Sequence, residues 1–377
     1  MTADETSTVR YYDELGCWVA WGREAAQSAL QDSRLSSETL EAANLSYLPA
    51  DMHEECSHLI ETMRRWFVLL DGDRHTVARR AIQPMFSPRR IRKLEETIEV
   101  IVAEELDAFA ASGATGDFDV ITGLADKISA RTIALLLGLP GDDDATLHRW
   151  AKALADFLAS SYRRDCAVNA QAALQEMGEF IKNAPDEEGE SIWSRATGGE
   201  WDRLATSSMV LFGGLETTAG LIGFAVWYML GNDLAEQVAA SEAGEEAKAV
   251  VERVLDVYAP LGHVARMASE DTELGGCPIA EGDLVLVSLT GRDLFDAQDL
   301  PTEPSGHQDG DRFDHVAFGY GMHYCVGAPL ARVTVANLLT QFARRFPKAS
   351  VKDVAWRKNR TFRGFDHLVL DVSGPQT

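Results

Sequence analysis

The sequence has few cysteines, and their arrangement does not suggest disulfide bonds. The five are Cys17, Cys56, Cys166, Cys277 and Cys325, and no two of them form a C-x-x-C pair. An odd number of scattered cysteines is typical of a reducing compartment, so we do not expect a disulfide framework. No other Cys or His stands at zinc-finger spacing from Cys325, so we do not predict a structural zinc site either.

Basic residues are also scarce relative to acidic ones. The 377 residues include 35 Lys and Arg against 59 Asp and Glu, which gives a formal net charge of -24. A field of this sign repels phosphate, so we expect neither nucleic acid nor an anionic membrane as a partner. The opening residues, MTADETSTVR, lack the basic and apolar stretches of a signal peptide, and we therefore predict a cytoplasmic protein.

The chain also lacks internal repeats and domain linkers. Two stretches rich in Pro, Gly and acidic residues, 183–190 and 300–310, do not separate two self-sufficient hydrophobic halves. Apolar residues recur at helical spacing over 89–109 and through much of 120–256, whereas extended patterns are short and few. The sequence predicts one large domain, residues 1–377, that is mainly α with a small β region.

One long apolar run stands out, MVLFGGLETTAGLIGFAVWYML over residues 209–230. It is long enough to cross a bilayer, whose hydrocarbon core is roughly 30 Å thick. Glu216 falls in its first half, however, and an uncompensated carboxylate is costly in lipid. We therefore favour a buried helix of a soluble core at about 207–230, with Glu216 beside Thr217 as a candidate functional site.

Cys325 follows a glycine-rich stretch and precedes an apolar, helix-forming one, in FGYGMHYCVGAPLAR over residues 318–332. Gly319 and Gly321 tolerate positive φ and let the backbone come close to a flat ligand. Cys325 is expected near a helix start, where free N–H groups stabilise a thiolate that can bind a metal. A hydrolytic nucleophile is the alternative, but it needs a histidine base, and His323 is too close in the chain to be an obvious one.

This segment resembles the haem-binding signature of the cytochrome P450 family, bacterial soluble type. The resemblance implies a haem b whose iron is ligated by Cys325, with Phe318 near the sulfur and His323 donating to a haem propionate. It assigns the haem-contacting residues of the loop, 318–327, as Phe318, Gly319, His323, Cys325 and Gly327.

Other parts of the chain extend the resemblance over roughly residues 11–370. His75 and Arg79 are similar to the family's HxxxR element, and their spacing puts them on one helix face toward the propionates. Arg266 matches the third propionate partner, and a guanidinium suits a carboxylate. Without the family, His75 and Arg79 would read as a solvated basic patch. The segment before the first strand is short compared with the family.

The stretch GGLETT, residues 213–218, resembles the family's oxygen-activation motif. The resemblance implies that Glu216 and Thr217 organise a relay of protons to iron-bound oxygen. The alternative is an acid and a hydroxyl that satisfy each other at a helix kink. The glycines at the start of the motif are expected to leave space for substrate and oxygen.

The family's ExxR pair is altered. In one alignment Arg253 and Asp256 hold its two positions with the charges exchanged, and a shift by one residue gives Glu252 and Leu255 without a basic member. Arg312 is a candidate partner for Asp256. We predict weaker core stability and haem loading than is usual in the family.

The resemblance implies a monooxygenase that inserts one oxygen atom from O2 into a small organic substrate. A partly hydrophobic substrate of natural-product biosynthesis, free or carrier-bound, is expected, with a pocket formed by residues 50–66, parts of 157–185 and 261–264. Two alternatives are a catalytically impaired haem-binding auxiliary protein and a peroxide-driven haem enzyme. Glu216 and Thr217 count against both.

The family also implies separate electron donors. NAD(P)H would supply electrons through a ferredoxin reductase and a ferredoxin, because no flavin or iron–sulfur domain fits in this length. The candidate docking residues are basic and occur in two groups: Arg79, Arg80, Arg89, Arg90, Arg92 and Lys93, then Arg344, Arg345 and Lys348.

Overall fold

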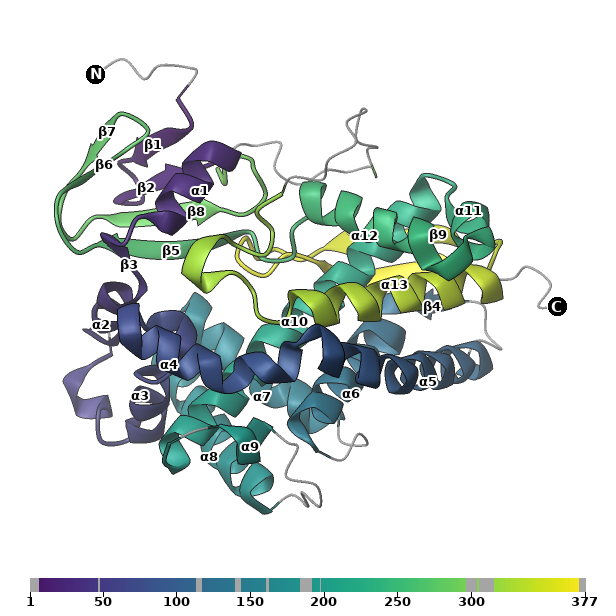
Figure 1. Ribbon diagram of the computed structural model, residues 1–377, viewed down its shortest axis with the longest axis horizontal. Coiled ribbons are helices and arrows are strands. Elements are labelled where there is room, and N and C mark those ends of the chain that lie inside the picture. The colour runs from purple at the N-terminus through teal and green to yellow at the C-terminus, as the bar shows by residue number, and fades with distance from the viewer. Residues whose placement is uncertain are drawn as a thin grey trace.

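The computed structural model describes residues 7–46, 48–112, 117–139, 144–160, 163–183, 192–196, 198–295, 304 and 315–372. Helices make up most of it (Figure 1). Their bounds are α1 Arg23–Gln31, α2 Ser37–Ser46, α3 Ser57–Met63, α4 Gly72–Ile82, α5 Pro88–Ser112, α6 Asp126–Leu137, α7 Asp144–Ala159, α8 Arg164–Asn183, α9 Ile192–Arg195, α10 Glu200–Gly231, α11 Ala235–Ala240, α12 Glu245–Val257 and α13 Ala328–Arg345. The predicted mainly α class is confirmed.

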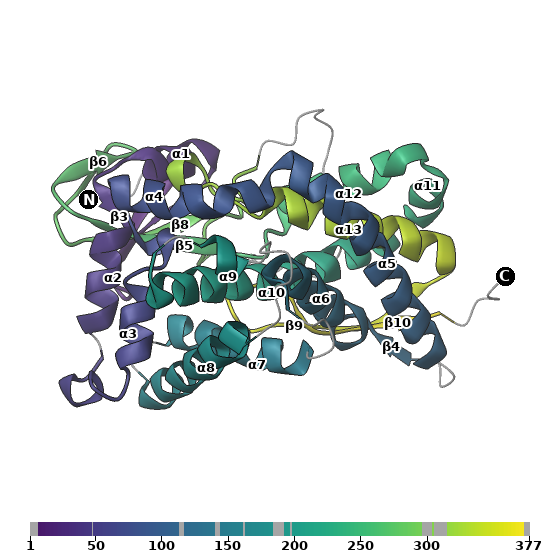
Figure 2. The ribbon, with the colours of Figure 1, turned by 60° about the horizontal axis from the view of Figure 1, so that its bottom comes forward.

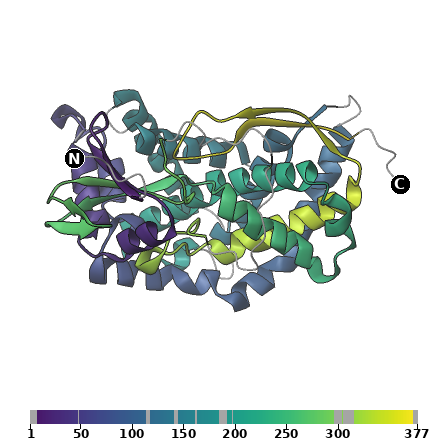
Figure 3. The ribbon, with the colours of Figure 1, turned by 90° about the horizontal axis from the view of Figure 1, so that it is seen from above.

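The β part is small and lies in separate sheets. The strands are β1 Val9–Tyr12, β2 Cys17–Ala20, β3 Leu35–Ser36, β4 Asp117–Asp119, β5 His263–Ala268, β6 Thr272–Leu274, β7 Cys277–Ile279, β8 Leu284–Ser288, β9 Ser350–Trp356 and β10 Phe365–Asp371. Five form a sheet at one end of the molecule, in the order β1-β2-β8-β5-β3 (Figure 1). A second sheet, β4-β10-β9, runs along one side (Figure 3).

The order of the five-stranded sheet brings Arg266 into the interior. β8 pairs in parallel with β2 and antiparallel with β5, so Arg266 lies opposite Val285 in the middle of the sheet. Val285 is fully buried and Arg266 is 7% exposed. The sheet therefore places a guanidinium where little water reaches it.

Helix α5 contains the amphipathic pattern over 89–109, and the burial of its apolar residues explains why this segment is a helix. Ile91, Leu94 and Ile98 are buried, whereas Arg92 and Lys93 between them are exposed. The apolar stripe packs against α13 and α6. The predicted helix is confirmed; it begins one residue earlier, at Pro88, and ends three residues later, at Ser112.

Helix α10 is the central helix of the structure (Figures 1 and 2). It is the one helix among the described residues that is long and apolar enough to cross a membrane, and 72% of its most apolar window is buried inside the protein. It packs on α6, α7, α12 and α13. The apolar run is thus a core helix in this structure, as its interruption by Glu216 predicted.

Candidate functional site

The Cys325 loop forms a tight turn before α13. Gly319 and Gly321 have φ values of +72° and +69°, the left-handed conformation predicted for them. The Cys325 N–H donates to the carbonyl of Phe318 at 2.8 Å and closes the turn. Cys325 lies three residues before Ala328, the first residue of α13. The predicted loop and helix start are therefore present.

The surroundings of the half-buried Cys325 act on its charge in opposite directions. Burial raises the pKa of the Cys325 thiol, while backbone N–H groups of Gly327 and Ala328 and the charges of Arg79 and Arg332 act to lower it. These N–H groups belong to the start of α13, where the helix dipole also favours an anion. The start of α13 and the two arginines therefore offset part of the cost that burial imposes on a Cys325 thiolate.

Four basic side chains predicted from distant parts of the sequence surround this loop. Helix α4 presents His75 and Arg79 to it: the rings of His75 and His323 lie 4.4 Å apart, and Arg79 donates to the carbonyl of Tyr324. The positive charge of Arg266 acts on both histidines. The structure therefore brings His75, Arg79, Arg266 and His323 into one basic cluster.

This basic cluster fits carboxylates of a cofactor. His75 Nε2 and His323 Nδ1 are buried and have no hydrogen-bond partner in the described part of the chain. Burial lowers the pKa of Arg266 to about 10, and burial with the neighbouring cations lowers that of His75 to about 4. Asp71 is an acidic neighbour, 3.4 Å from His323 Nε2. Buried cations and orphaned nitrogens of this kind are stabilised by anions, as two haem propionates would provide.

The two candidate relay residues on α10 each make a hydrogen bond within the protein. Glu216 Oε2 accepts a hydrogen bond from Arg357 Nη1 at 2.7 Å, and Thr217 Oγ1 donates to the carbonyl of Gly213 at 2.6 Å. Burial, with the charge of Glu216 also contributing, raises the pKa of nearby Asp126 on α6. Arg357, just after β9, was not predicted, because it is 141 residues from Glu216.

One expectation for the oxygen-activation motif is corrected. A Cβ at Gly214 would overlap the Ile133 side chain of α6, so this glycine allows two helices to pack closely instead of opening space for ligands. At Gly213 a Cβ would meet only Met209 Cε, at 3.2 Å.

The segment in which we predicted an altered ExxR pair contains an ion pair that was not predicted. Glu252 binds Arg332 of α13 at 2.5 and 3.0 Å, so it does have a basic partner, although not at position 255. Arg253 instead pairs with Glu246 at 3.0 Å. The predicted partner of Asp256, Arg312, lies outside the described residues, and weaker haem loading stays a prediction.

Aromatic residues connect the segments expected to line a substrate pocket. Trp66 stacks on Phe212 of α10 with ring centres 5.8 Å apart, and Phe212 meets Phe362 edge-on at 5.4 Å. Phe362 in turn forms a backbone bridge with Leu261. Parts of the predicted regions 50–66 and 261–264 therefore converge on the same buried aromatic cluster.

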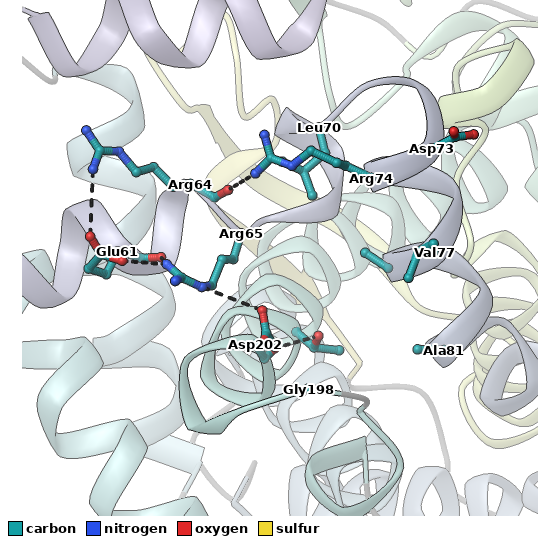
Figure 4. A pocket seen from close by; sticks show the side chains of 12 residues that line it. Glu61, Arg64, Arg65, Leu70, Asp73, Arg74, Val77, Ala81, Gly198 and Asp202 are labelled. Carbon is teal, nitrogen blue, oxygen red and sulfur yellow. Dashed lines mark hydrogen bonds and ion pairs between the residues drawn. The ribbon is translucent and has the colours of Figure 1, made fainter.

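A surface cavity of about 790 Å³ lies between α3, α4 and the start of α10 (Figure 4). The arginines that line it form ion pairs with carboxylates. Arg65 pairs with Glu61 at 2.6 Å and with Asp202 at 3.5 Å, and Arg64 pairs with Glu61 at 3.7 Å. Arg74, also in its lining, pairs with Glu38. The cavity is therefore nearly balanced in charge, and we assign it no ligand.

Comparisons with known proteins give a consistent result. A family model described as Cytochrome P450 matches residues 247–362. The chain is 31% identical to Cytochrome P450 165C4 of Amycolatopsis orientalis over 74% of this chain and 68% of that protein. It is 27% identical to 6-deoxyerythronolide B hydroxylase of Saccharopolyspora erythraea over 98% of this chain and 94% of that protein.

A solved structure shares the fold. P450BioI in complex with an acyl carrier protein ligated to hexadec-9Z-enoic acid superposes with a TM-score of 0.79. The two are 23% identical, and the match covers 95% of this chain and 92% of that one.

Proposed function

This chain belongs to the cytochrome P450 family, and on that premise we propose that Cys325 is the axial ligand of its haem iron in a monooxygenase of natural-product biosynthesis. Members of this family bind haem b through an axial cysteine thiolate, and the relatives are monooxygenases and hydroxylases. The observation that carries the proposal is the basic cluster, in which buried histidine nitrogens without partners lie beside the Cys325 loop.

Each residue of the basic cluster has a role in holding the cofactor. Arg266 and Arg79 would pair with propionates, and His75 would donate from Nε2. His323, whose Nε2 faces Asp71, would donate from Nδ1 as an imidazolium that a propionate stabilises. Phe318, Gly319 and Gly327 would line the loop beside the sulfur. When bound, the haem supplies the binding and activation of dioxygen.

Glu216 and Thr217 move protons in this proposal. The Thr217 hydroxyl, now bonded to the Gly213 carbonyl, still has lone pairs that can accept from water. Glu216 passes a proton toward that hydroxyl, and Arg357 fixes where its carboxylate lies. Asp126, whose raised pKa favours its neutral form, is a candidate proton source for Glu216.

Glu216→Gln and Thr217→Val test this relay. General acid–base groups contribute about 100-fold or more to rate, so the Gln variant should lose about 100-fold in product formation. The Val variant should still consume oxygen but release more of it as hydrogen peroxide. Thr206→Val is the matched control, because Thr206 makes the same bond to a carbonyl four residues earlier on α10.

The ratio of product to NAD(P)H consumed measures the effect. An unchanged ratio and rate in both variants would refute the relay. A peroxide-driven enzyme would instead turn over with hydrogen peroxide alone and tolerate both substitutions. An impaired auxiliary protein would bind haem but form no product in any variant.

We further propose a cytoplasmic enzyme that acts on a partly hydrophobic substrate, either free or attached to a carrier protein. The aromatic cluster of Trp66, Phe212 and Phe362 joins segments predicted to line the pocket, and its apolar character supports an apolar substrate. The complex of P450BioI with an acyl carrier protein is the precedent for a carrier. Free and carrier-linked acyl chains can be compared by the shift that each produces in the oxidised haem spectrum.

A ferredoxin, reduced by an NAD(P)H-dependent reductase, is the proposed electron donor. Arg80, Arg89, Arg92 and Lys93 are exposed on α4 and α5. Two residues of the second group of predicted docking residues already have partners within the protein. Arg345 pairs with Asp107, and Arg344 donates to the carbonyl of Ala239. We therefore assign the docking surface mainly to the α4–α5 side.

A further inference from the structure

A single carboxylate on α12 contacts both ends of the segment that carries Cys325. Glu252 Oε1 accepts from Arg332 Nε at 2.5 Å and Oε2 from Nη2 at 3.0 Å, a two-point contact. Oε2 also lies 3.2 Å from His315 Nε2. His315 precedes the loop and Arg332 follows it, so Glu252 joins the two flanks.

The hydrogen bonds define the charge states of this group. The Nδ1 atom of His315 accepts from the Ala317 N–H at 3.3 Å, so Nε2 carries the proton and donates to Glu252. Burial opposes the charge of Glu252, but the bonds from His315 and Arg332 lower its pKa to about 2. The ion pair is therefore formed at neutral pH.

Arg332 also contacts residues of the turn around Cys325. Its guanidinium lies over the ring of Phe318, 4.6 Å from the ring centre, and Nη1 donates to the Tyr324 hydroxyl at 3.4 Å. The Phe318 carbonyl is the acceptor for the Cys325 N–H. Arg332 thus touches the residue that holds Cys325 and the residue just before it.

We propose that Glu252, Arg332 and His315 form a clamp that positions the Cys325 loop, with Glu252 as the positioning residue. We name it the Glu252 clamp. In the alignment that puts Arg253 and Asp256 at the family's ExxR positions, the clamp anchors the loop to the same helix from the neighbouring residue. Only the effect of the clamp on iron ligation rests on the proposed function of Cys325.

Backbone hydrogen exchange of the haem-loaded protein tests the clamp. Glu252→Gln keeps the size of the side chain but removes its charge, and should speed exchange of the amides in residues 315–327 about tenfold. Because Glu252 acts on the loop through Arg332, Glu252→Gln combined with Arg332→Gln should exchange no faster than Arg332→Gln alone. Arg332→Lys, which keeps the charge but loses the two-point contact, should be intermediate.

Glu246→Gln is the matched control. It breaks the pair with Arg253 on the same helix, and Glu246 is 29% exposed, close to the 24% of Glu252. Exchange in residues 315–327 should stay at the parent rate. If Glu252→Gln does not fold, His315→Asn, which removes one arm of the clamp, replaces it in the comparison.

The reduced, CO-bound spectrum is the second readout. Glu252→Gln should convert part of the thiolate-type Soret band to the band of a protein without thiolate ligation, and Glu246→Gln should not. Unchanged loop exchange in the Glu252 variant, or equal acceleration in the control, would overturn the clamp. Accelerated exchange in a protein whose parent form lacks the thiolate band would support the clamp while refuting ligation by Cys325.

Discussion

At the scale of single residues, burial decides the charge of a histidine on β5. His263 begins β5 opposite Ser288, and its Nδ1 is buried without a hydrogen-bond partner in the ranges that the structure covers. Burial lowers the pKa of His263 to about 4. The folded protein therefore keeps this imidazole neutral where an unfolded chain already takes up a proton.

This difference predicts a loss of stability in acid. As pH falls through about 6.5, the unfolded chain binds a proton that the folded protein binds only near pH 4, so unfolding becomes easier. His263 should account for about 2 kcal/mol of lost unfolding free energy between pH 7 and pH 5. His263→Asn should remove that part of the pH dependence in chemical unfolding. Identical pH dependence in the variant and the parent would contradict the assignment.

Residues in local motifs could be predicted from the sequence, whereas those defined by distant contacts could not. Cys325, His75 and Arg79 stand in recognisable spacings, and the structure places them together. Glu252 and Arg332 meet only because α12 packs on α13, 80 residues along the chain. No local pattern contains that information.

At the scale of elements, an ion pair holds the polar middle of α10 to a neighbouring element. The pair of Glu216 and Arg357 connects this helix to the end of β9, and the two side chains are 16% and 30% exposed. Breaking one side leaves a mostly buried carboxylate without its cation, which is costly.

Arg357→Leu should therefore lower the free energy of unfolding by about 2 kcal/mol. Arg357→Lys retains the charge and should cost less than half of that. Chemical denaturation of the two variants and the parent measures both effects. A Leu variant as stable as the parent would show that the ion pair contributes little.

Helix α10 also shows which element bounds are predictable. Its apolar core from 209 to 230 was evident, but the helix starts at Glu200. Asp202 accepts the Gly199 N–H at 2.8 Å and caps the first turn. Trp201, Leu204 and Ala205 have helical spacing, but they precede the continuous apolar run, so the predicted helix began about seven residues late. The partner strand β9 could not be placed beside α10 from the sequence.

At the scale of the whole molecule, a basic surface on a chain of net charge -24 should steer an acidic partner. Reversing Arg92 and Lys93 to Glu should slow reduction by ferredoxin about tenfold at low salt, and the difference should shrink at high salt. Stopped-flow reduction measures this rate. Lys152→Glu is the control, because Lys152 is exposed on a different helix, α7. Equal slowing by the control would point to overall charge instead of a docking site.

The reduced, CO-bound absorption spectrum tests the central claim most directly. The parent protein should show the red-shifted Soret band of a thiolate-ligated haem, and Cys325→Ser should lose that band while the four other cysteines remain. A parent protein that binds haem without the band, or a Cys325→Ser protein that keeps it, would contradict ligation by Cys325.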